Sequence, residues 1–180
     1  ALAPTHEEVL VAALIIYRCR QVGWDAAKQL AEKAYEEADK AMTPPYGAVL
    51  LRGAFETLRA LKAQSFKTAL ATTDSHKRAQ ESLNKLKIGR YFDVVLGADD
   101  VARGKPAPDM ILKACKLTKC SPRDAVMVGD SRSDMLMGKN AEVKACIGVL
   151  SGSTSREKIE KVADVVVPSI ASLQYKCLFR

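Results

Sequence analysis

From residue 66 to residue 167 the chain alternates short apolar runs with segments of helical pattern. The runs are rich in Val, Leu and Ala, which is typical of strands buried on both faces of a parallel sheet. We expect strands over residues 66–72, 93–96, 125–128, 143–149 and 164–167. We expect helices over residues 53–63, 75–86, 108–117, 131–138 and 155–162. This alternation predicts a doubly wound α/β fold with right-handed crossovers and a mainly parallel, Rossmann-like sheet.

Residues 1–46 have a different pattern. Two helices are expected here, over residues 5–21 and 25–42, and the pair Pro44-Pro45 ends the second. The first of these helices is apolar almost all round, so another part of the protein has to cover it. We therefore expect a small N-terminal helical region over residues 1–46 and an α/β core over residues 47–180.

The composition argues against several classes of function. The net charge is +7, but the basic residues are scattered at helical spacings without interleaved aromatic residues, which favours solvated helix faces over a nucleic-acid surface. The five cysteines form no Cys-x-x-Cys pair and the chain has only two histidines, which argues against a zinc site. The longest apolar stretch, Val9 to Tyr17, is too short to cross a bilayer. We expect a soluble, cytoplasmic protein without nucleic-acid or membrane partners, whose positive field attracts small anionic substrates.

The stretch over residues 125–138 combines a strand, a tight turn and the start of a helix. Asp130 stands where the strand ends, and Ser131 can cap a helix that runs to Gly138, a natural C-terminal stop. Asp134 is one helical turn beyond Asp130, so both carboxylates lie at one end of this helix. Such a pair suits Mg²⁺, which prefers oxygen ligands. A capping Asp beside a solvated Asp explains the same pattern, and the spacing alone leaves both readings open.

Two other strand ends carry groups that suit a phosphate. Thr72 and Thr73 stand at the end of the first expected strand. Lys105 follows the second, in a loop that Pro106 stiffens, so we expect its ammonium to point inward, close to the Asp130 carboxylate or to a bound anion. A lone Lys before Pro is usually a surface residue. Because ligands of parallel sheets bind beyond the carboxyl ends of the strands, a Thr, a Lys and two Asp at these ends favour a binding site.

Three segments resemble motifs of a known family. Residues 70–73 (Leu-Ala-Thr-Thr), 104–109 (Gly-Lys-Pro-Ala-Pro-Asp) and 128–134 (Val-Gly-Asp-Ser-Arg-Ser-Asp) resemble the second, third and fourth motifs of the haloacid dehalogenase (HAD) superfamily. The likeness is greatest to its phosphoglycolate-phosphatase-like hydrolases and extends over residues 50–170. It implies a HAD core, with residues 1–46 in the place of the helical cap that closes over the substrate.

The resemblance also implies a role for each site residue. Thr72 and Thr73 would bind the transferring phosphoryl group, and Lys105 would neutralise charge on the nucleophile and the phosphate. Asp130 and Asp134 would hold Mg²⁺. These are the roles of phosphoryl transfer, which depends on positioning and on neutralisation of negative charge.

The function that the resemblance implies is that of a Mg²⁺-dependent phosphohydrolase, a phosphomonoesterase acting on a small phosphorylated metabolite. A catalytically inactive relative that binds phosphate or a protein partner is the alternative, and a dehalogenase fits less well. The sequence leaves the substrate and the oligomeric state open.

One part of the family pattern is absent from the 180 residues. Family members begin with a strand ending in Asp-x-Asp, which supplies the nucleophile of an aspartyl-phosphate intermediate, and no Asp-x-Asp occurs here. We expect this nucleophile upstream of Ala1, on a central strand between the strands that end at Thr72 and Asp130. If this strand is missing, the two neighbouring strands stand apart with open edges, or another segment fills the gap between them, or they pair directly with each other. The hydrogen bonds and the burial that the missing strand supplies are worth of order ten kcal/mol of stability.

Two smaller departures concern helix ends. Ser65 and Glu142 stand where relatives commonly have Gly. If the backbone is left-handed at these positions, each substitution costs about 1 kcal/mol.

Overall fold

The computed structural model describes residues 22–41, 49–152 and 154–173. They belong to two compact units, one up to Ala48 and the other from Val49 onward, and each is described by itself. In the first unit, helix α2 (Trp24–Ala41) confirms the helix expected over residues 25–42. The helix expected over residues 5–21 lies outside the described residues, and the assignment of residues 1–46 to a cap stays a prediction.

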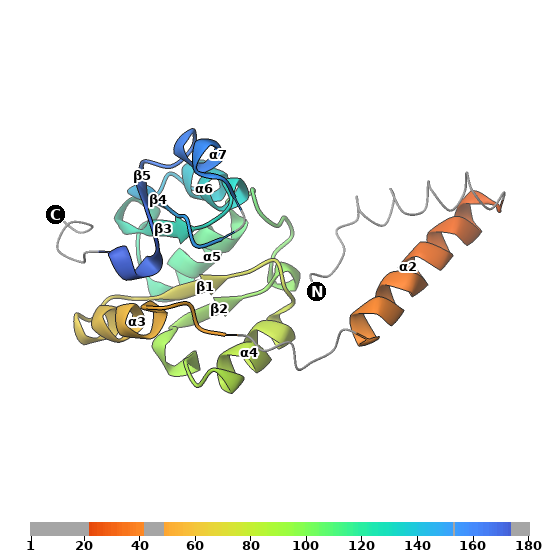
Figure 1. The fold of residues 1–180 in the computed structure, drawn as a ribbon, viewed down its shortest axis with the longest axis horizontal. Coiled ribbons are helices and arrows are strands. Elements are labelled where there is room, and N and C mark those ends of the chain that lie inside the picture. Colours follow the sequence, from red (N-terminus) through yellow and green to blue (C-terminus); the bar gives the residue numbers. More distant parts are fainter. Residues whose placement is uncertain (1–21, 42–48, 153, 174–180) are drawn as a thin grey trace. The chain divides into compact units, whose positions relative to one another are not determined.

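The second unit alternates helices and strands in the order that the sequence predicts, which confirms the α/β class (Figure 1). The strands are β1 (Ala69–Ala71), β2 (Val94–Leu96), β3 (Val126–Gly129), β4 (Ala145–Val149) and β5 (Val165–Val167). The α-helices are α3 (Ala54–Ala63), α4 (His76–Lys85), α5 (Asp109–Thr118), α6 (Arg132–Asn140) and α7 (Arg156–Glu160). Short 3-10 helices are η1 (Gly89–Tyr91), η2 (Ala98–Asp100), η3 (Pro122–Asp124) and η4 (Ile170–Ser172). Among the helices of the described ranges, none combines the length and the apolar composition that crossing a bilayer requires.

The strands form two parallel sheets. In one, β1 pairs with β2 and Ala69 lies opposite Val94. In the other, β4 is the central strand, with Val126 of β3 opposite its Ala145 on one side and β5 on the other. Within the described ranges no ladder of hydrogen bonds joins β1 to β3. The direct pairing of these two strands, one of the arrangements expected from the sequence, is therefore not found among the described residues.

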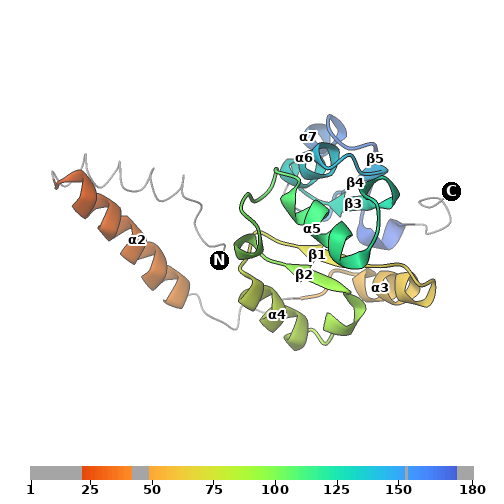
Figure 2. The same cartoon turned by 180° about the vertical axis from the view of Figure 1, so that it is seen from behind.

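Apolar side chains cover both faces of the β1–β2 pair. Leu70 of β1 packs into a cluster with Leu83 of α4 and Tyr91 of η1. The next residue, Ala71, packs against the cluster that contains Met110 of α5. Because successive residues of a strand point to opposite faces, this alternation gives β1 apolar contacts on both of its faces. Helix α5 lies on the face turned towards the viewer in Figure 2.

The core beneath α5 also connects the two sheets. Its buried cluster contains Leu96 of β2, Met137 of α6 and Ala141 directly after α6, and Met127 of β3 packs against it. The two sheets therefore share one hydrophobic layer, although no hydrogen bond joins their strands in the described residues.

Helix α6 continues beyond the stop that the sequence predicts. Gly138 lies inside this helix, which ends at Asn140, so its assignment as a C-terminal stop is wrong. A side chain at residue 138 would meet Cys146 Sγ at 2.5 Å and Met127 Cβ at 2.9 Å. Gly138 is therefore needed because the helix packs closely on β3 and β4, a tertiary reason that its position in the sequence does not reveal.

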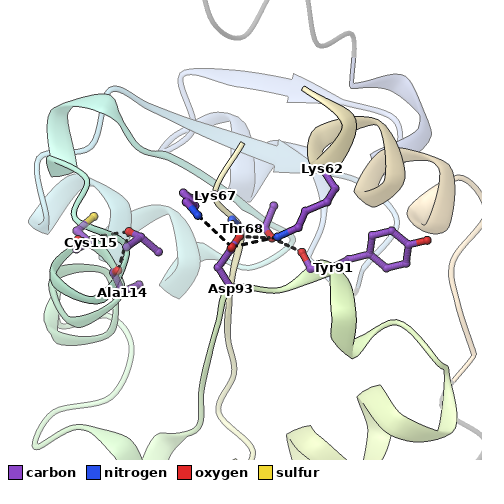
Figure 3. Close-up of polar contacts among 8 residues, drawn as sticks. Lys62, Lys67, Thr68, Tyr91, Asp93, Ala114 and Cys115 are labelled. Atoms are coloured by element: carbon purple, nitrogen blue, oxygen red, sulfur yellow. Dashed lines mark hydrogen bonds and ion pairs between the residues drawn. The ribbon is translucent and has the colours of Figure 1, made fainter. Parts of the chain in front are cut away.

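Asp93 ties together the beginnings of β1 and β2 (Figure 3). Its Oδ2 accepts a hydrogen bond of 2.9 Å from the backbone N–H of Thr68, and its own N–H donates to the Thr68 carbonyl at 2.8 Å. The ammonium groups of Lys62 and Lys67 lie 3.0 Å and 3.4 Å from Oδ1. The Thr68 N–H, followed by Lys62, outweighs the effect of burial and lowers the pKa of Asp93 from 3.8 to about 2.

Candidate active site

Thr72 lies directly after β1, at its carboxyl end. Its N–H donates to the Leu96 carbonyl at 3.0 Å, which keeps the residue in line with the sheet. Its hydroxyl oxygen accepts a hydrogen bond of 3.1 Å from the N–H of Asp74. The hydroxyl is thereby held by the following turn and keeps its own proton for another acceptor. Thr73, the second threonine that the sequence singles out, is exposed.

Lys105 points inward from the loop between β2 and α5. Only 11% of its side chain is exposed. The ammonium donates to the Ala71 carbonyl at 2.9 Å and to Asp134 Oδ1 at 2.7 Å. The sequence predicts the inward direction, but the carboxylate that Lys105 meets is Asp134 rather than Asp130. Lys105 thus links the end of β1 to the start of α6, across the two sheets.

Asp134 has both carboxylate oxygens occupied. Oδ1 accepts from Lys105, and Oδ2 accepts from the N–H of Ser131 at 3.1 Å and from its hydroxyl at 2.7 Å. The Ser131 hydroxyl oxygen in turn accepts from the N–H of Asp134, which completes a capping box at the start of α6. Burial alone would raise the pKa of Asp134, but the Lys105 ammonium and the Ser131 donors together lower it below its ordinary value.

Asp130 is placed differently. It follows β3 and is half-buried, and in the described part of the chain no hydrogen bond or ion pair to its carboxylate is found. Its Oδ2 lies against the backbone of Gly152 in the loop after β4. The residues described here contain no group of three or more His, Cys, Asp or Glu side chains arranged to hold a metal ion. Asp130 therefore has a carboxylate available for a cation, whereas Asp134 already has a partner.

A further link fixes the loop that carries Lys105. The Asn140 side chain, at the end of α6, donates to the Pro106 carbonyl at 2.9 Å, directly after the cis peptide bond between Lys105 and Pro106. No pattern in the sequence indicates this contact, since it joins residues on different elements. The Ala71 carbonyl and Gly152 are likewise parts of the site that sequence reasoning missed.

A second polar cluster lies beyond the end of β2. His76 Nδ1 is 2.6 Å from Asp100 Oδ2, and the same oxygen accepts from the Gly97 N–H at 2.9 Å. The backbone N–H of His76 donates to Asp99 Oδ1 at 2.7 Å. The Gly97 N–H above all lowers the pKa of Asp100. These contacts hold the start of α4 against the segment that leads to Lys105.

The fold and the site together define a doubly wound α/β protein with a buried lysine–carboxylate pair at the carboxyl edge of its parallel strands. The family model for haloacid dehalogenase-like hydrolases matches residues 4–148. The chain therefore belongs to the haloacid dehalogenase-like hydrolase family, as the sequence motifs predict.

Individual relatives agree with this assignment. Pyrophosphatase PpaX of Bacillus cereus is 39% identical over 90 residues, which are 50% of this chain and 42% of the relative. The chain thus spans less than half the length of the curated relatives it matches. A predicted phosphoglycolate phosphatase from Haemophilus somnus superposes with a TM-score of 0.67 at 23% identity, over 94% of this chain and 81% of that one. A HAD phosphatase from Thermococcus onnurineus superposes with a TM-score of 0.67 at 20% identity, over 96% and 89%. At these identities the solved structures support the fold.

Proposed function

We propose that the whole protein is a Mg²⁺-dependent phosphohydrolase, a phosphomonoesterase that acts on a small phosphorylated metabolite through an aspartyl-phosphate intermediate. The observation that carries the proposal is the buried Lys105 ammonium, held between the Ala71 carbonyl and the Asp134 carboxylate beside Thr72. A fixed cation at the same sheet edge as a hydroxyl donor and as a carboxylate without a partner among the described residues suits a bound phosphate with its metal. Relatives named pyrophosphatase and phosphoglycolate phosphatase support the same class of reaction.

In this proposal Lys105 neutralises negative charge. An ammonium has three protons, and two are directed at Ala71 and Asp134. The third is left for an oxygen of the phosphoryl group or of the nucleophile. Because the Asp134 carboxylate and the Ala71 carbonyl hold the Lys105 ammonium in place before substrate binds, its charge needs no reorganisation during the reaction.

Thr72 orients the phosphoryl group in the same proposal. Its hydroxyl accepts from Asp74, so its proton is available to a phosphoryl oxygen. Thr73 stands next to it on the exposed side, and we place it in contact with the substrate as well.

The carboxylates at this edge fit Mg²⁺. Mg²⁺ is commonly held by one or two carboxylates together with waters and substrate phosphate oxygens. Asp130 offers a carboxylate without a protein partner among the described residues, and Asp134 lies one turn further along the chain. When bound, Mg²⁺ would polarise the phosphoryl group and offset its negative charge. We assign Asp130 as the principal ligand and Asp134 as the second carboxylate, which binds the ion directly or through a water while its ion pair also holds Lys105.

The nucleophile is proposed on an upstream strand between β1 and β3. Support comes from the edge of β1 turned away from β2, which pairs with no other strand of the described residues. In a parallel ladder a residue's N–H and C=O point to the same side, and neighbouring residues alternate. The Thr72 N–H is bonded to β2, so Ala71 faces away from β2, and its carbonyl is the group that Lys105 binds. A strand inserted along this edge would bring its end to the Lys105 ammonium.

Hydrolysis of p-nitrophenyl phosphate with Mg²⁺ tests the proposal. It is measured on the 180-residue chain and on a form extended upstream to include an Asp-x-Asp strand. We expect turnover by the extended form and none by the shorter chain. In the extended form, Lys105→Ala lowers kcat roughly 100-fold to 1,000-fold, because it removes a fixed charge from the reacting group.

The matched control is Lys116→Ala, which removes an exposed lysine of α5 and leaves turnover unchanged. An extended form that hydrolyses no phosphomonoester, or a Lys105→Ala variant with parental activity, contradicts the proposal.

A further inference from the structure

Gly152 meets the Asp130 carboxylate from a distant part of the chain. It lies in the loop after β4, whereas Asp130 follows β3. A Cβ built on Gly152 would fall far inside van der Waals contact of Asp130. Its three nearest atoms, Oδ2, Cγ and Cβ, all belong to this one side chain. No side chain therefore fits at residue 152 while Asp130 keeps its present orientation.

We propose that Gly152 is a positioning residue for Asp130, holding it as a ligand that offers a single oxygen to a metal ion. The inference rests on the proposed function, because it concerns the carboxylate that the proposal assigns to Mg²⁺. The backbone of Gly152 covers Oδ2, where its Cα–H makes the kind of weak contact that carbon donors make with oxygen. Oδ1 is left without a partner in the described part of the chain.

This arrangement favours one kind of cation. Mg²⁺ is small, demands octahedral geometry and keeps several waters, so a carboxylate that gives one oxygen suits it. Ca²⁺ takes more oxygens and often binds both oxygens of one carboxylate. With Oδ2 covered, Asp130 is a poor ligand for Ca²⁺. Gly152 thus contributes to metal choice without touching the metal.

The test measures Mn²⁺ binding by electron paramagnetic resonance on the extended form of the protein, with Mg²⁺ and Ca²⁺ as competitors. We expect Mg²⁺ to displace Mn²⁺ at lower concentration than Ca²⁺ does. Gly152→Ala places a Cβ against Asp130 and displaces its carboxylate, and it weakens Mn²⁺ binding roughly 10-fold to 100-fold, the usual effect of disturbing a group that orients a ligand. The control is Gly89→Ala, where an added Cβ stands 3.8 Å from Leu83 Cβ, an ordinary contact, and binding stays parental.

A second measurement separates the contact with Asp130 from general strain in the loop. Asp130→Gly removes all three atoms that a Cβ at residue 152 would meet. Gly152→Ala should therefore lower the Tm of the parent but not that of Asp130→Gly. Equal losses of Tm in both backgrounds, or parental Mn²⁺ binding by Gly152→Ala, overturn the inference and leave the proposed function standing. A parent that binds no Mn²⁺ and hydrolyses no phosphate ester overturns the proposed function, and the metal role of Gly152 with it.

Discussion

At the scale of single residues, two aspartates join strands in the same way. Asp93 precedes β2 and exchanges hydrogen bonds with the backbone of Thr68. Asp164 precedes β5 and exchanges them with Cys146 of β4, at 2.7 Å and 2.8 Å. In each case a lysine of an earlier helix meets the carboxylate, Lys62 of α3 or Lys139 of α6. The carboxylate acts as an extra rung at the amino end of an edge strand, where the ladder alone leaves backbone donors unpaired.

The Asp93 contact makes stability depend on pH. Its folded pKa of about 2 lies below the ordinary 3.8, so the charged form stabilises the fold above pH 3.8, and this contribution is lost as the pH falls towards 2. At neutral pH we expect Asp93→Asn to lower the free energy of unfolding by about 1 kcal/mol, the value of a hydrogen bond to a partly exposed charge. As the pH falls from 3.8 to about 2, the free energy of unfolding of the Asp93→Asn variant decreases less steeply than that of the parent.

Urea unfolding from pH 2 to pH 7 measures both effects. Asp124→Asn is the control, because Asp124 is exposed and its side chain makes no hydrogen bond or ion pair with the described residues. If Asp93→Asn and the parent have identical profiles of stability against pH, the contact with Thr68 does not stabilise the ionised carboxylate of Asp93.

At the scale of elements, four helices end in the same strained way. After α3, α4, α5 and α6 a residue other than Gly has a positive φ of 54° to 61°. These residues are Ser65, Lys87, Lys119 and Glu142. In each case the next residue donates its N–H to the carbonyl five positions earlier, as in a Schellman motif. The sequence predicts a cost at Ser65 and Glu142 only if their backbone is left-handed. The structure has this left-handed backbone at both residues.

Glycine at these positions should stabilise the protein. A left-handed residue with a Cβ costs about 1–2 kcal/mol, and part of the gain is offset because Gly is more flexible in the unfolded chain. We expect Ser65→Gly and Glu142→Gly each to raise the free energy of unfolding by about 0.5–1 kcal/mol, and the two effects to add because the sites are on different helices.

Chemical denaturation of the single and double variants measures these gains. Lys116→Gly, at an exposed site inside α5, should instead lower stability by about 1 kcal/mol. A loss of stability on placing Gly at Ser65 and Glu142 would mean that these side chains make contacts worth more than the strain.

At the scale of the whole core, a shared apolar layer and the Lys105 side chain link the two sheets. The cluster under α5 touches both sheets, and Lys105 joins Ala71 to Asp134 at the carboxyl edge. The edge of β1 turned away from β2 makes no ladder within the described residues. An unpaired parallel edge inside a covered fold is costly, because its backbone groups lack partners.

Hydrogen exchange can detect whether an upstream strand fills this edge. In the extended form proposed above, the amides of Ala69 and Ala71 should exchange more slowly than in the 180-residue chain, because they face away from β2. The Thr72 amide, already bonded to Leu96, is the internal reference and should change less. Exchange of Ala71 that stays as fast in the extended form would place the upstream strand elsewhere.

The order of helices and strands, their parallel direction and the positions of the site residues follow from the sequence by itself. The spacing of apolar residues along a helix or a strand is a local property of the sequence. The helix cap at Ser131 and the strand ends at Thr72 and Asp130 are also set by neighbouring residues in the chain. The expected strand over residues 66–72 is longer than β1, because tertiary pairing with β2 sets its observed length.

Only the tertiary structure decided which groups meet. Lys105 contacts Asp134, Gly138 packs closely against Cys146, and Gly152 lies against Asp130. The two residues of each pair belong to different elements or loops. Local spacing reports which way a side chain faces along its own helix or strand. Contacts between elements depend on how the elements pack, and packing is set by the combined fit of many side chains.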